Sequence, residues 1–385
     1  GLAAVTEPRK VVLLGATGSI GDSALRVIRA HPDKLHLVGA AAYSNAEKLF
    51  SIAKEFEVTE LCLVEPGIDA CPPENANLRT GVDGLEELAA LPETDLTLVA
   101  VVGSAGLQPT LAALGVGKDV VLANKEALVL GGKFVMEAAR TSGARILPAD
   151  SEHNAVFQCL EGSDNKDVER IILTASGGPF RNLSLEDMAT VTPEQALDHP
   201  NWSMGPKITI DSATMANKGL ELIEARWLFD LPSERLDVIV HPTSLVHSLV
   251  RFTDGCMLAQ LSPPSMTFAL QHALLHPERA EGVDKPLDFS QPLDLSFRPP
   301  DLERFPCLRL AREALASEGI APAIFNAANE VAVDAFLRKR IGFLEIAGII
   351  ESTLSAMEHH EPHSLDEVIA SDTEARRLAT ERIDG

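Results

Sequence analysis

The chain has 385 residues, with 33 basic and 56 acidic side chains, and its formal net charge is −23 at neutral pH. This charge repels polyanions, and an aromatic content of 4% with one tyrosine is too low for a base-stacking surface. Nucleic acid is therefore excluded as the expected partner, whereas a small phosphorylated substrate could still bind through backbone dipoles and a few well-placed cations.

The first part of the chain alternates apolar strands with helices, and the total length leaves room for two or three domains. The expected strands are residues 11–14, 35–42, 60–64, 96–102, 119–122 and 144–147, and the first two helices are 22–30 and 46–56. Near-continuous apolar strands that alternate with helices indicate a doubly wound parallel sheet. We therefore expect an α/β fold whose N-terminal, Rossmann-like domain covers residues 1–148.

The pattern changes after this domain. Expected strands at 170–174, 238–240 and 245–252 mix with helices at 217–229 and 266–276, which indicates a central α+β domain over residues 149–280. Residues 281–306 are rich in proline and aspartate and are expected to be a linker. Helical patterns at 308–318, 323–338, 343–357 and 364–383 predict a C-terminal α-helical bundle over residues 307–385.

The cysteines and the N-terminal segment indicate in which cellular compartment the protein is expected. Five scattered cysteines without a Cys-x-x-Cys pair favour reduced thiols. No apolar run reaches the roughly 18 residues of a membrane span, and the first residues lack the features of a signal peptide. We expect a cytoplasmic protein without a membrane partner. A plastid location, with a transit peptide removed before Gly1, is the alternative.

A glycine-rich turn at residues 15–21 follows the first strand and opens the first helix. Its spacing is Gly-x-x-Gly-x-x-Gly, and its context is that of a dinucleotide-binding turn. The glycines allow the backbone to approach a pyrophosphate, whose charge meets the helix N-terminus. The structural alternative is a tight turn that binds no nucleotide.

The end of the second strand favours NADP over NAD. Residues 36–45 contain no acid for a ribose 2′-hydroxyl and end in Tyr43, Ser44 and Asn45. Short-chain dehydrogenases share the glycine turn, but their Tyr-x-x-x-Lys pair is missing, because Tyr43 is followed four residues later by Glu47. Cys159 has no activating neighbour, so we expect a buried core thiol rather than a semialdehyde dehydrogenase nucleophile.

Two acids just past an apolar strand predict a metal site. In an extended segment Asp150 and Glu152 would point the same way, and two carboxylates that close need a proton or a cation between them. Oxygen ligands favour Mg²⁺ or Mn²⁺ over zinc. The alternative is a solvated loop. Lys125 follows the strand at 119–122 and is expected at the same edge of the sheet.

Further polar groups lie in the central domain. Residues 199–207 resemble a lid that carries a tryptophan, although that tryptophan could instead pack on a neighbouring domain. On a helix, Asn217, Lys218 and Glu221 share one face, which suits a phosphate at one end and a metal at the other. An exposed polar helix face is the alternative. Residues 174–179 form a small polar turn that could serve as an anion nest.

Taken together, these motifs carry a resemblance to a known family. They are Gly-Ala-Thr-Gly-Ser-Ile-Gly at 15–21, Asn-Lys-Glu at 124–126, Asp-Ser-Glu-His-Asn at 150–154, Ala-Ser-Gly-Gly-Pro-Phe at 175–180, His-Pro-Asn-Trp-Ser-Met-Gly at 199–205 and Asp-Ser-Ala-Thr-Met-Ala-Asn-Lys-Gly-Leu-Glu at 211–221. The chain resembles the 1-deoxy-D-xylulose-5-phosphate reductoisomerases from about residue 11 to beyond Asn-Ala-Ala-Asn-Glu at 326–330.

The resemblance implies a homodimeric enzyme of the non-mevalonate isoprenoid pathway and a target of fosmidomycin. Such an enzyme uses NADPH and Mg²⁺ or Mn²⁺, with Co²⁺ as an alternative, to form 2-C-methyl-D-erythritol 4-phosphate. It isomerises the substrate by a retro-aldol/aldol sequence and then reduces the aldehyde. The central domain would be catalytic, with a mobile flap at residues 196–207.

The resemblance also assigns residues to the site. The implied metal ligands are Asp150, Glu152 and Glu221, which with Lys125 and His199 would be catalytic. The implied substrate contacts are Lys125, Ser151, Glu152, Ser176, His199, Trp202, Ser212, Asn217, Lys218 and Glu221. The implied NADPH contacts are Thr17, Gly18, Ser19, Ile20, Ser44, Asn45, Asn124, Glu126 and Gly205.

The chain departs from the family in two stretches. Many relatives have Gly-Lys-Asn or Gly-Arg-Asn where this chain has Tyr-Ser-Asn at 43–45. The family's Gln-Leu-Gly-x-Pro-Asp-Met-Arg reads Gln-Leu-Ser-Pro-Pro-Ser-Met-Thr at 260–267. Two other functional classes stay open at this point: a metal-independent NADP oxidoreductase and a non-catalytic NADP-sensing regulator.

Overall fold

The structure, a computed structural model, describes residues 6–67, 71–198 and 204–385. The chain forms two compact units. The first comprises Gly1–Ala127, Lys133–Asn154 and Ser265–Pro286, and the second comprises Leu128–Gly132, Ala155–Pro264 and Leu287–Gly385. The domain limits at residues 148, 280 and 306 stay predictions. Among the described residues, no helix has both the length and the apolar character needed to cross a membrane.

The first unit is built on a parallel sheet of seven strands, in the order β4-β3-β2-β1-β5-β6-β7. The strands are β1 Arg9–Leu14, β2 Leu35–Ala42, β3 Glu60–Leu63, β4 Asn77–Thr80, β5 Leu96–Val99, β6 Asp119–Leu122 and β7 Ile146–Pro148. The last four residues of β1 and all of β5 are buried, which is why these strands read as continuous apolar runs. The predicted doubly wound sheet is confirmed.

Helices accompany this sheet, and one of them comes from much later in the chain. They are α1 Ser19–Ala30, α2 Ala46–Phe56, α3 Gly81–Ala89, α4 Leu107–Gly115, α5 Glu126–Ser142, the start of α6 Ser151–Cys159, α11 Met266–Leu275 and the 3-10 turn η1 Gly103–Gly106. Helix α11 packs against α1, where the side chains of His31 and Gln271 are hydrogen-bonded at 3.2 Å.

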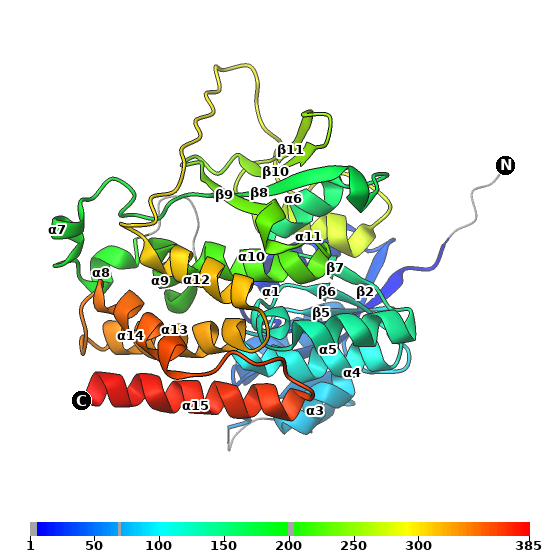
Figure 1. Ribbon diagram of the computed structural model, residues 1–385. Coiled ribbons are helices and arrows are strands. Elements are labelled where there is room, and N and C mark those ends of the chain that lie inside the picture. Colours follow the sequence, from blue (N-terminus) through cyan, green and yellow to red (C-terminus); the bar gives the residue numbers. More distant parts are fainter. Residues whose placement is uncertain (1–5, 68–70, 199–203) are drawn as a thin grey trace. The chain divides into compact units, whose positions relative to one another are not determined.

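The second unit contains a mixed sheet in the order β11-β10-β8-β9 (Figure 1). Its strands are β8 Val168–Ala175, β9 Leu236–Val240, β10 Val246–Phe252 and β11 Met257–Leu261. Strands β8 and β9 are parallel, whereas β10 is antiparallel to both of its neighbours. Strands β4 and β11 were not predicted from the sequence. Both are short edge strands, and β4 has only one apolar residue, whereas the apolar residues of β11 are largely exposed.

The rest of the second unit is helical. Its helices are α7 Leu185–Met188, α8 Pro193–Ala196, α9 Pro206–Thr214, α10 Ala216–Leu228, α12 Pro306–Ser317, α13 Ala321–Leu337, α14 Glu345–Ala356 and α15 Leu365–Asp384, with 3-10 turns η2 Asn165–Asp167 and η3 Ser233–Arg235. Helix α13 packs against α14 and α15 (Figure 1) and buries Phe325 and Phe336. The predicted C-terminal helical bundle is confirmed.

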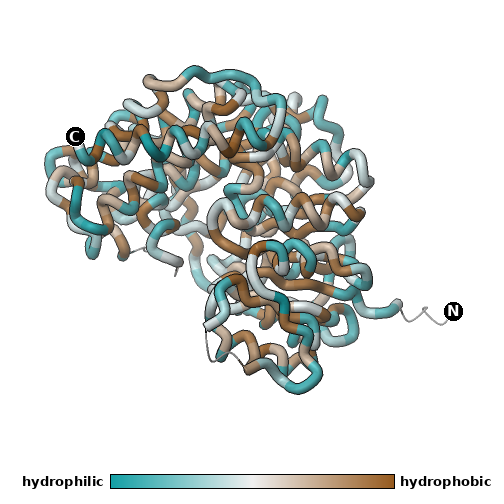
Figure 2. The backbone as a smooth tube through the Cα atoms, turned by 90° about the horizontal axis from the view of Figure 1, so that it is seen from below, coloured by the Kyte–Doolittle hydropathy of each residue, from teal (hydrophilic) through white to brown (hydrophobic). Residues whose placement is uncertain are grey.

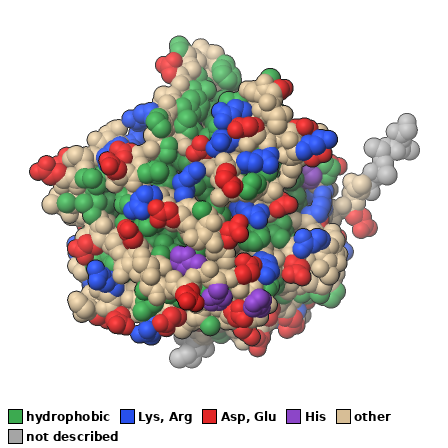
Figure 3. All heavy atoms as spheres, in the orientation of Figure 1, with side chains coloured by type: hydrophobic (Ala, Val, Ile, Leu, Met, Phe, Trp, Pro, Cys, Tyr) green, Lys and Arg blue, Asp and Glu red, His purple; other side chains and the backbone are tan. Residues whose placement is uncertain are grey.

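The distribution of polarity fits these elements. Figure 2 shows hydrophilic and hydrophobic residues alternating along the helical segment that ends at the C-terminus, as expected for a helix with one buried face. Figure 3 shows acidic and basic side chains interspersed over the face that it draws. This agrees with the sequence, in which acidic residues outnumber basic ones without long runs of either.

Candidate active site

The glycine turn between β1 and α1 depends on the absence of side chains. Gly15 has φ +88°, and a Cβ atom there would lie 2.5 Å from the carbonyl oxygen of Ala100, just past β5. A Cβ atom on Gly21 would lie 2.5 Å from the oxygen of Gly15. Because β1 lies between β2 and β5, the turn is at the point where the strand order reverses, the usual ligand crevice of such sheets.

The predicted cofactor residues of this turn lie at the start of α1. Gly18 is the N-cap residue, and Ser19 is the first helical residue, followed by Ile20. The first backbone N–H groups of a helix have no partner within it and carry partial positive charge. The turn therefore provides the geometry for binding a pyrophosphate.

Helix α2, which follows β2, contains a cation that was not predicted as a site residue, Lys48. Asn45 caps α2, since its side chain accepts a hydrogen bond from the backbone N–H of Lys48 at 3.1 Å. The Lys48 ammonium donates to the Thr17 carbonyl oxygen at 3.0 Å and pairs with Asp22 at 2.8 Å. The sequence shows only that Lys48 comes three residues after the helix cap. Its partner Asp22 is 26 residues away in the chain, so the local sequence did not indicate where the ammonium group points.

Asn124 links two strand ends. Its side-chain amide donates to the carbonyl oxygens of Val101 and Gly103 at 2.9 and 2.8 Å and accepts from the N–H of Ala127 at 2.7 Å. These bonds hold the segments that follow β5 and β6 together. Glu126 is the first residue of α5 and is 6% exposed.

Lys125 and Asp150 form an ion pair at the carboxyl edge of the sheet. Lys125 follows β6 and Asp150 follows β7, and these strands are adjacent and parallel. The two side chains are 14% and 22% exposed. The prediction that Lys125 lies beside the acidic segment is confirmed for Asp150.

The predicted extended conformation of this acidic segment is wrong. Helix α6 begins at Ser151, and the N–H of Asn154 donates to the Asp150 carbonyl oxygen at 2.8 Å, so Asp150 is at the N-cap position. Strand β7 ends at Pro148, and aspartate is a favoured N-cap residue, which explains the early turn. Asp150 and Glu152 are therefore brought to the helix N-terminus, not to one face of a strand.

The second group of predicted residues lies where α9 meets α10 in the second unit. Met215, with φ 65°, separates the two helices, so that Ser212 is in the last turn of α9 and Asn217 is the second residue of α10. Lys218 and Glu221 form an ion pair and are 5% and 1% exposed. Their predicted shared face is confirmed, and the alternative of an exposed polar face is wrong for this pair.

The turn after β8 lies against this junction. The N–H of Gly178 donates to the Ser176 hydroxyl oxygen at 3.2 Å. A Cβ atom on Gly178 would lie 2.6 Å from the Ser212 carbonyl oxygen, so the turn and α9 are in close contact. The side-chain oxygen of Asn217 is buried and accepts no hydrogen bond from the described residues. Such an atom is a candidate ligand contact.

A buried aspartate fixes α9 in place. Asp211 is 1% exposed, pairs with Lys207 at 2.6 Å and accepts a hydrogen bond from the Asn329 side chain at 2.9 Å. The Asn-Ala-Ala-Asn-Glu motif of α13 therefore supports the helix that carries Ser212. No role was predicted for this motif from the sequence.

Part of the predicted flap can be located. His199 and Trp202 lie outside the described residues. Gly205 is the exposed N-cap of α9, and Pro206 is its first residue, so the last two residues of the predicted flap are helical. Its first residue, Ala196, ends α8.

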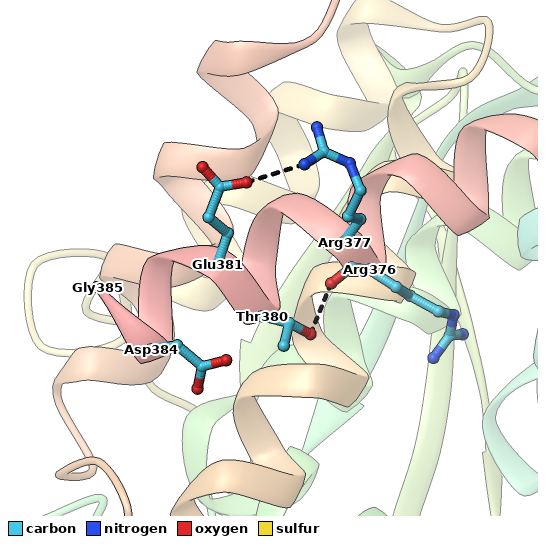
Figure 4. A pocket seen from close by; sticks show the side chains of 6 residues that line it. All are labelled: Arg376, Arg377, Thr380, Glu381, Asp384 and Gly385. Carbon is cyan, nitrogen blue, oxygen red and sulfur yellow. Dashed lines mark hydrogen bonds and ion pairs between the residues drawn. The ribbon is translucent and has the colours of Figure 1, made fainter.

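Two other features contain no predicted catalytic group. Cys159 is buried, as predicted, and burial raises the pKa of its thiol to about 11, the opposite of activation. A hollow along the last turns of α15 is lined by charged side chains (Figure 4). Its Arg377 is paired with Glu374 and Glu381 of the same helix, so these charges are balanced locally.

Family models match most of the chain. A model described as 1-deoxy-D-xylulose 5-phosphate reductoisomerase matches residues 11–132. A model of the C-terminal domain of that reductoisomerase matches residues 146–229, and one described as the DXP reductoisomerase C-terminal domain matches residues 261–378.

Relatives of known name are similar over nearly the full length. The 1-deoxy-D-xylulose 5-phosphate reductoisomerase of Ralstonia nicotianae is 49% identical over 383 residues, covering 96% of this chain and 97% of its own. The enzyme of Geobacter metallireducens is 48% identical, with coverages of 97% and 99%. The Zymomonas mobilis enzyme in complex with NADPH has a TM-score of 0.92 at 46% identity, covering 98% of this chain and 100% of its own. A DOX-P reductoisomerase with NADPH, fosmidomycin and magnesium has a TM-score of 0.90 at 41% identity, with coverages of 98% for both.

Proposed function

Because this chain belongs to the 1-deoxy-D-xylulose 5-phosphate reductoisomerase family, we propose that it converts 1-deoxy-D-xylulose 5-phosphate into 2-C-methyl-D-erythritol 4-phosphate with NADPH and a divalent metal ion. The observation that carries this proposal is 49% identity to a named enzyme over 96% of the chain. Solved relatives have been described with NADPH, with magnesium and with the inhibitor fosmidomycin.

NADPH is assigned to the carboxyl edge of the first unit's sheet. The turn at Thr17–Ile20 and the N-terminus of α1 would hold the pyrophosphate. Ser44 and Asn45, together with Lys48, would recognise the 2′-phosphate, for which a lysine provides a point charge. Asn124, Glu126 and Gly205 complete the proposed cofactor contacts.

The chemistry of the donor set supports the metal assignment. The proposed ligands are Asp150 and Glu152 of the first unit and Glu221 of the second. All three offer carboxylate oxygens, which suit Mg²⁺ or Mn²⁺. Magnesium in solved relatives agrees with this all-oxygen donor set.

The substrate's phosphate is assigned to the second unit. Ser176 and Ser212 lie on segments in close contact, and Asn217 and Lys218 open the next helix. Asn217 would contact the phosphate through its side-chain N–H₂ group, because phosphate oxygens accept hydrogen bonds. Ser151, His199 and Trp202 are proposed as further substrate contacts.

The proposed roles in the reaction are divided between the metal ion, NADPH and the side chains of the protein. When bound, the metal supplies Lewis-acid polarisation of the substrate's oxygens, and NADPH supplies the hydride. The retro-aldol/aldol sequence develops negative charge on an enolate oxygen, which the Lys125 ammonium would stabilise. Contacts to the phosphate would orient the carbon chain, and closure of the flap would exclude water.

We further propose a homodimer that works in the cytoplasm. Strand β11 is at the edge of its sheet and exposes Met257, Leu258 and Leu261. An edge strand with exposed apolar side chains is suited to pairing with a second copy of the chain. Sedimentation equilibrium should therefore give twice the chain mass. A monomer at micromolar concentration would contradict this part of the proposal.

One assay tests the activity. The absorbance of NADPH should fall when 1-deoxy-D-xylulose 5-phosphate is added, and EDTA should stop the reaction until Mg²⁺ or Mn²⁺ is restored. A metal-independent oxidoreductase would be insensitive to EDTA. A non-catalytic NADP sensor would show no substrate-dependent oxidation of NADPH, and either result would overturn the proposal.

A further inference from the structure

A small cavity in the second unit is lined by Arg181, Arg298 and Arg304 and has a volume of about 50 Å³. The backbone brings these residues together from distant segments. Arg298 and Val240 exchange two N–H···O bonds of 2.8 Å, which joins the segment before α12 to the end of β9. A Cβ atom on Gly177 would lie 3.0 Å from the Cβ of Arg181, so the turn after β8 packs tightly on that arginine.

The positive charge around this cavity is not balanced by its lining. Asp301 is the one carboxylate among the lining residues, and its two oxygens accept from the Arg304 side chain at 2.9 Å and from backbone N–H groups of Glu303 and Arg304 at 3.1 Å. Within the described chain, neither Arg181 nor Arg298 is paired with a carboxylate. Their side chains make single long hydrogen bonds of 3.4 Å, to the Gly178 oxygen and to Asn182.

Arg181 carries the strongest sign of a missing partner. Its Nε atom is buried and has no hydrogen-bond partner among the described residues. Burial lowers the pKa of Arg181, and the nearby charge of Arg298 lowers it further. The Arg181 guanidinium stays charged, and its buried Nε–H group requires an acceptor. The cavity thus concentrates positive charge in a chain whose net charge is −23.

The size of the cavity restricts the ligand. A single water requires roughly 10–15 Å³ of such volume, so the cavity accommodates a group of about four or five non-hydrogen atoms. That is the size of a tetrahedral oxyanion and is too small for a nucleotide or a sugar. Guanidinium groups bind phosphate oxygens with paired N–H donors.

From these observations we propose that Arg181, Arg298 and Arg304 form a binding site for inorganic phosphate, separate from the site proposed for the substrate's phosphate. Gly177 and Met215 line the cavity, and their neighbours in sequence are Ser176 and the first residues of α10. The anion would therefore bind behind the turn and junction that carry the substrate contacts. The proposal rests on the charge and size of this cavity and not on the enzymatic activity.

Calorimetric titration with sodium phosphate, at constant ionic strength and without metal, tests the site. Arg298 is exposed, so Arg298→Gln should fold normally. Arg309→Gln is the matched control, since it removes the same charge from α12 of the same unit. Losing one charge-assisted contact should weaken phosphate binding roughly tenfold in Arg298→Gln and leave it unchanged in Arg309→Gln.

A third variant separates this site from the proposed substrate site. In Ser176→Ala/Asn217→Ala, phosphate should still bind, and adding Arg298→Gln should still weaken that binding. The proposal is overturned if Arg298→Gln binds phosphate as tightly as the unaltered chain. It is also overturned if the Ser176→Ala/Asn217→Ala variant no longer binds phosphate, because the ion would then have been in the substrate site.

Discussion

The ammonium group of Lys125 donates a hydrogen bond to the carboxylate of Asp150, although 25 residues separate them in the chain. The pairing of β6 with β7 brings them together, since each residue follows one of these strands. In the proposed function Asp150 is a metal ligand and Lys125 stabilises the enolate. In this proposal the Asp150 carboxylate would contact both the Lys125 ammonium group and the bound metal ion.

This relationship predicts opposite effects of two substitutions on metal binding. Lys125→Gln removes a positive charge beside the metal ligands, so Mn²⁺ should bind at least as tightly as in the unaltered chain. Turnover should nevertheless fall by roughly 10²–10³, the usual effect of losing one stabilising donor. Asp150→Asn should lose both metal binding and turnover. Paramagnetic titration with Mn²⁺ and NADPH oxidation measure the two quantities, and weaker Mn²⁺ binding in Lys125→Gln would contradict this account.

Glu221→Gln tests whether Glu221, the proposed ligand from the second unit, binds the metal ion. Turnover should fall by several orders of magnitude while the dissociation constant for NADPH, measured by fluorescence, stays nearly unchanged. Because the substitution removes the ion pair with the buried Lys218, it should also lower stability. Asp230→Asn is the control, since it removes an exposed acid just beyond the same helix. Unchanged turnover in folded Glu221→Gln would end the metal assignment.

Lys48→Gln tests recognition of the 2′-phosphate. The dissociation constant for NADPH should rise roughly tenfold, because one charge-assisted contact is lost, whereas that for NADH should not change. Lys54→Gln, an exposed lysine on the same helix, should leave both constants as they are. Equal weakening of NADPH and NADH binding would mean that Lys48 supports the glycine turn rather than the phosphate.

The lowered pKa of the Asp284 carboxyl group predicts how acid destabilises the first unit. Its pKa is held well below the ordinary range, first by Arg26 of α1 and then by the hydroxyls of Thr267 and Ser265 at the start of α11. A carboxyl whose folded pKa is depressed stabilises the fold above its unfolded pKa of about 3.9 and loses this contribution as the pH falls towards the folded value.

The expected result is a melting-temperature difference that depends on pH. Asp284→Asn should unfold a few degrees lower than the unaltered chain at about pH 7, and the difference should shrink as the pH falls below about 4. Thermal unfolding followed by circular dichroism measures both values. Glu281→Gln, at an exposed position nearby, should have no effect at either pH. A difference that grows in acid would contradict the assigned direction.

Much of the local structure was determined by the sequence. Apolar runs predicted six of the seven strands of the parallel sheet, all except β4, and the 3.6-residue period predicted the shared face of Lys218 and Glu221. These signals suffice because each depends on neighbours within one or two turns of the same element. Gly15 and Gly21 were recognised for the same reason, since a tight turn imposes its requirement on each residue separately.

Only the tertiary structure decided which side chains meet. Lys125 reaches Asp150 through strand pairing, and Lys48 turns towards the glycine turn, which no local pattern encodes. The acidic segment at 150–154 was predicted to be extended, with a solvated loop as the alternative, but helix α6 begins at Ser151. The arginine cavity joins segments more than a hundred residues apart, as the bond between Arg298 and Asn182 illustrates. Such contacts depend on how whole elements pack, and a one-dimensional pattern carries no information about that packing.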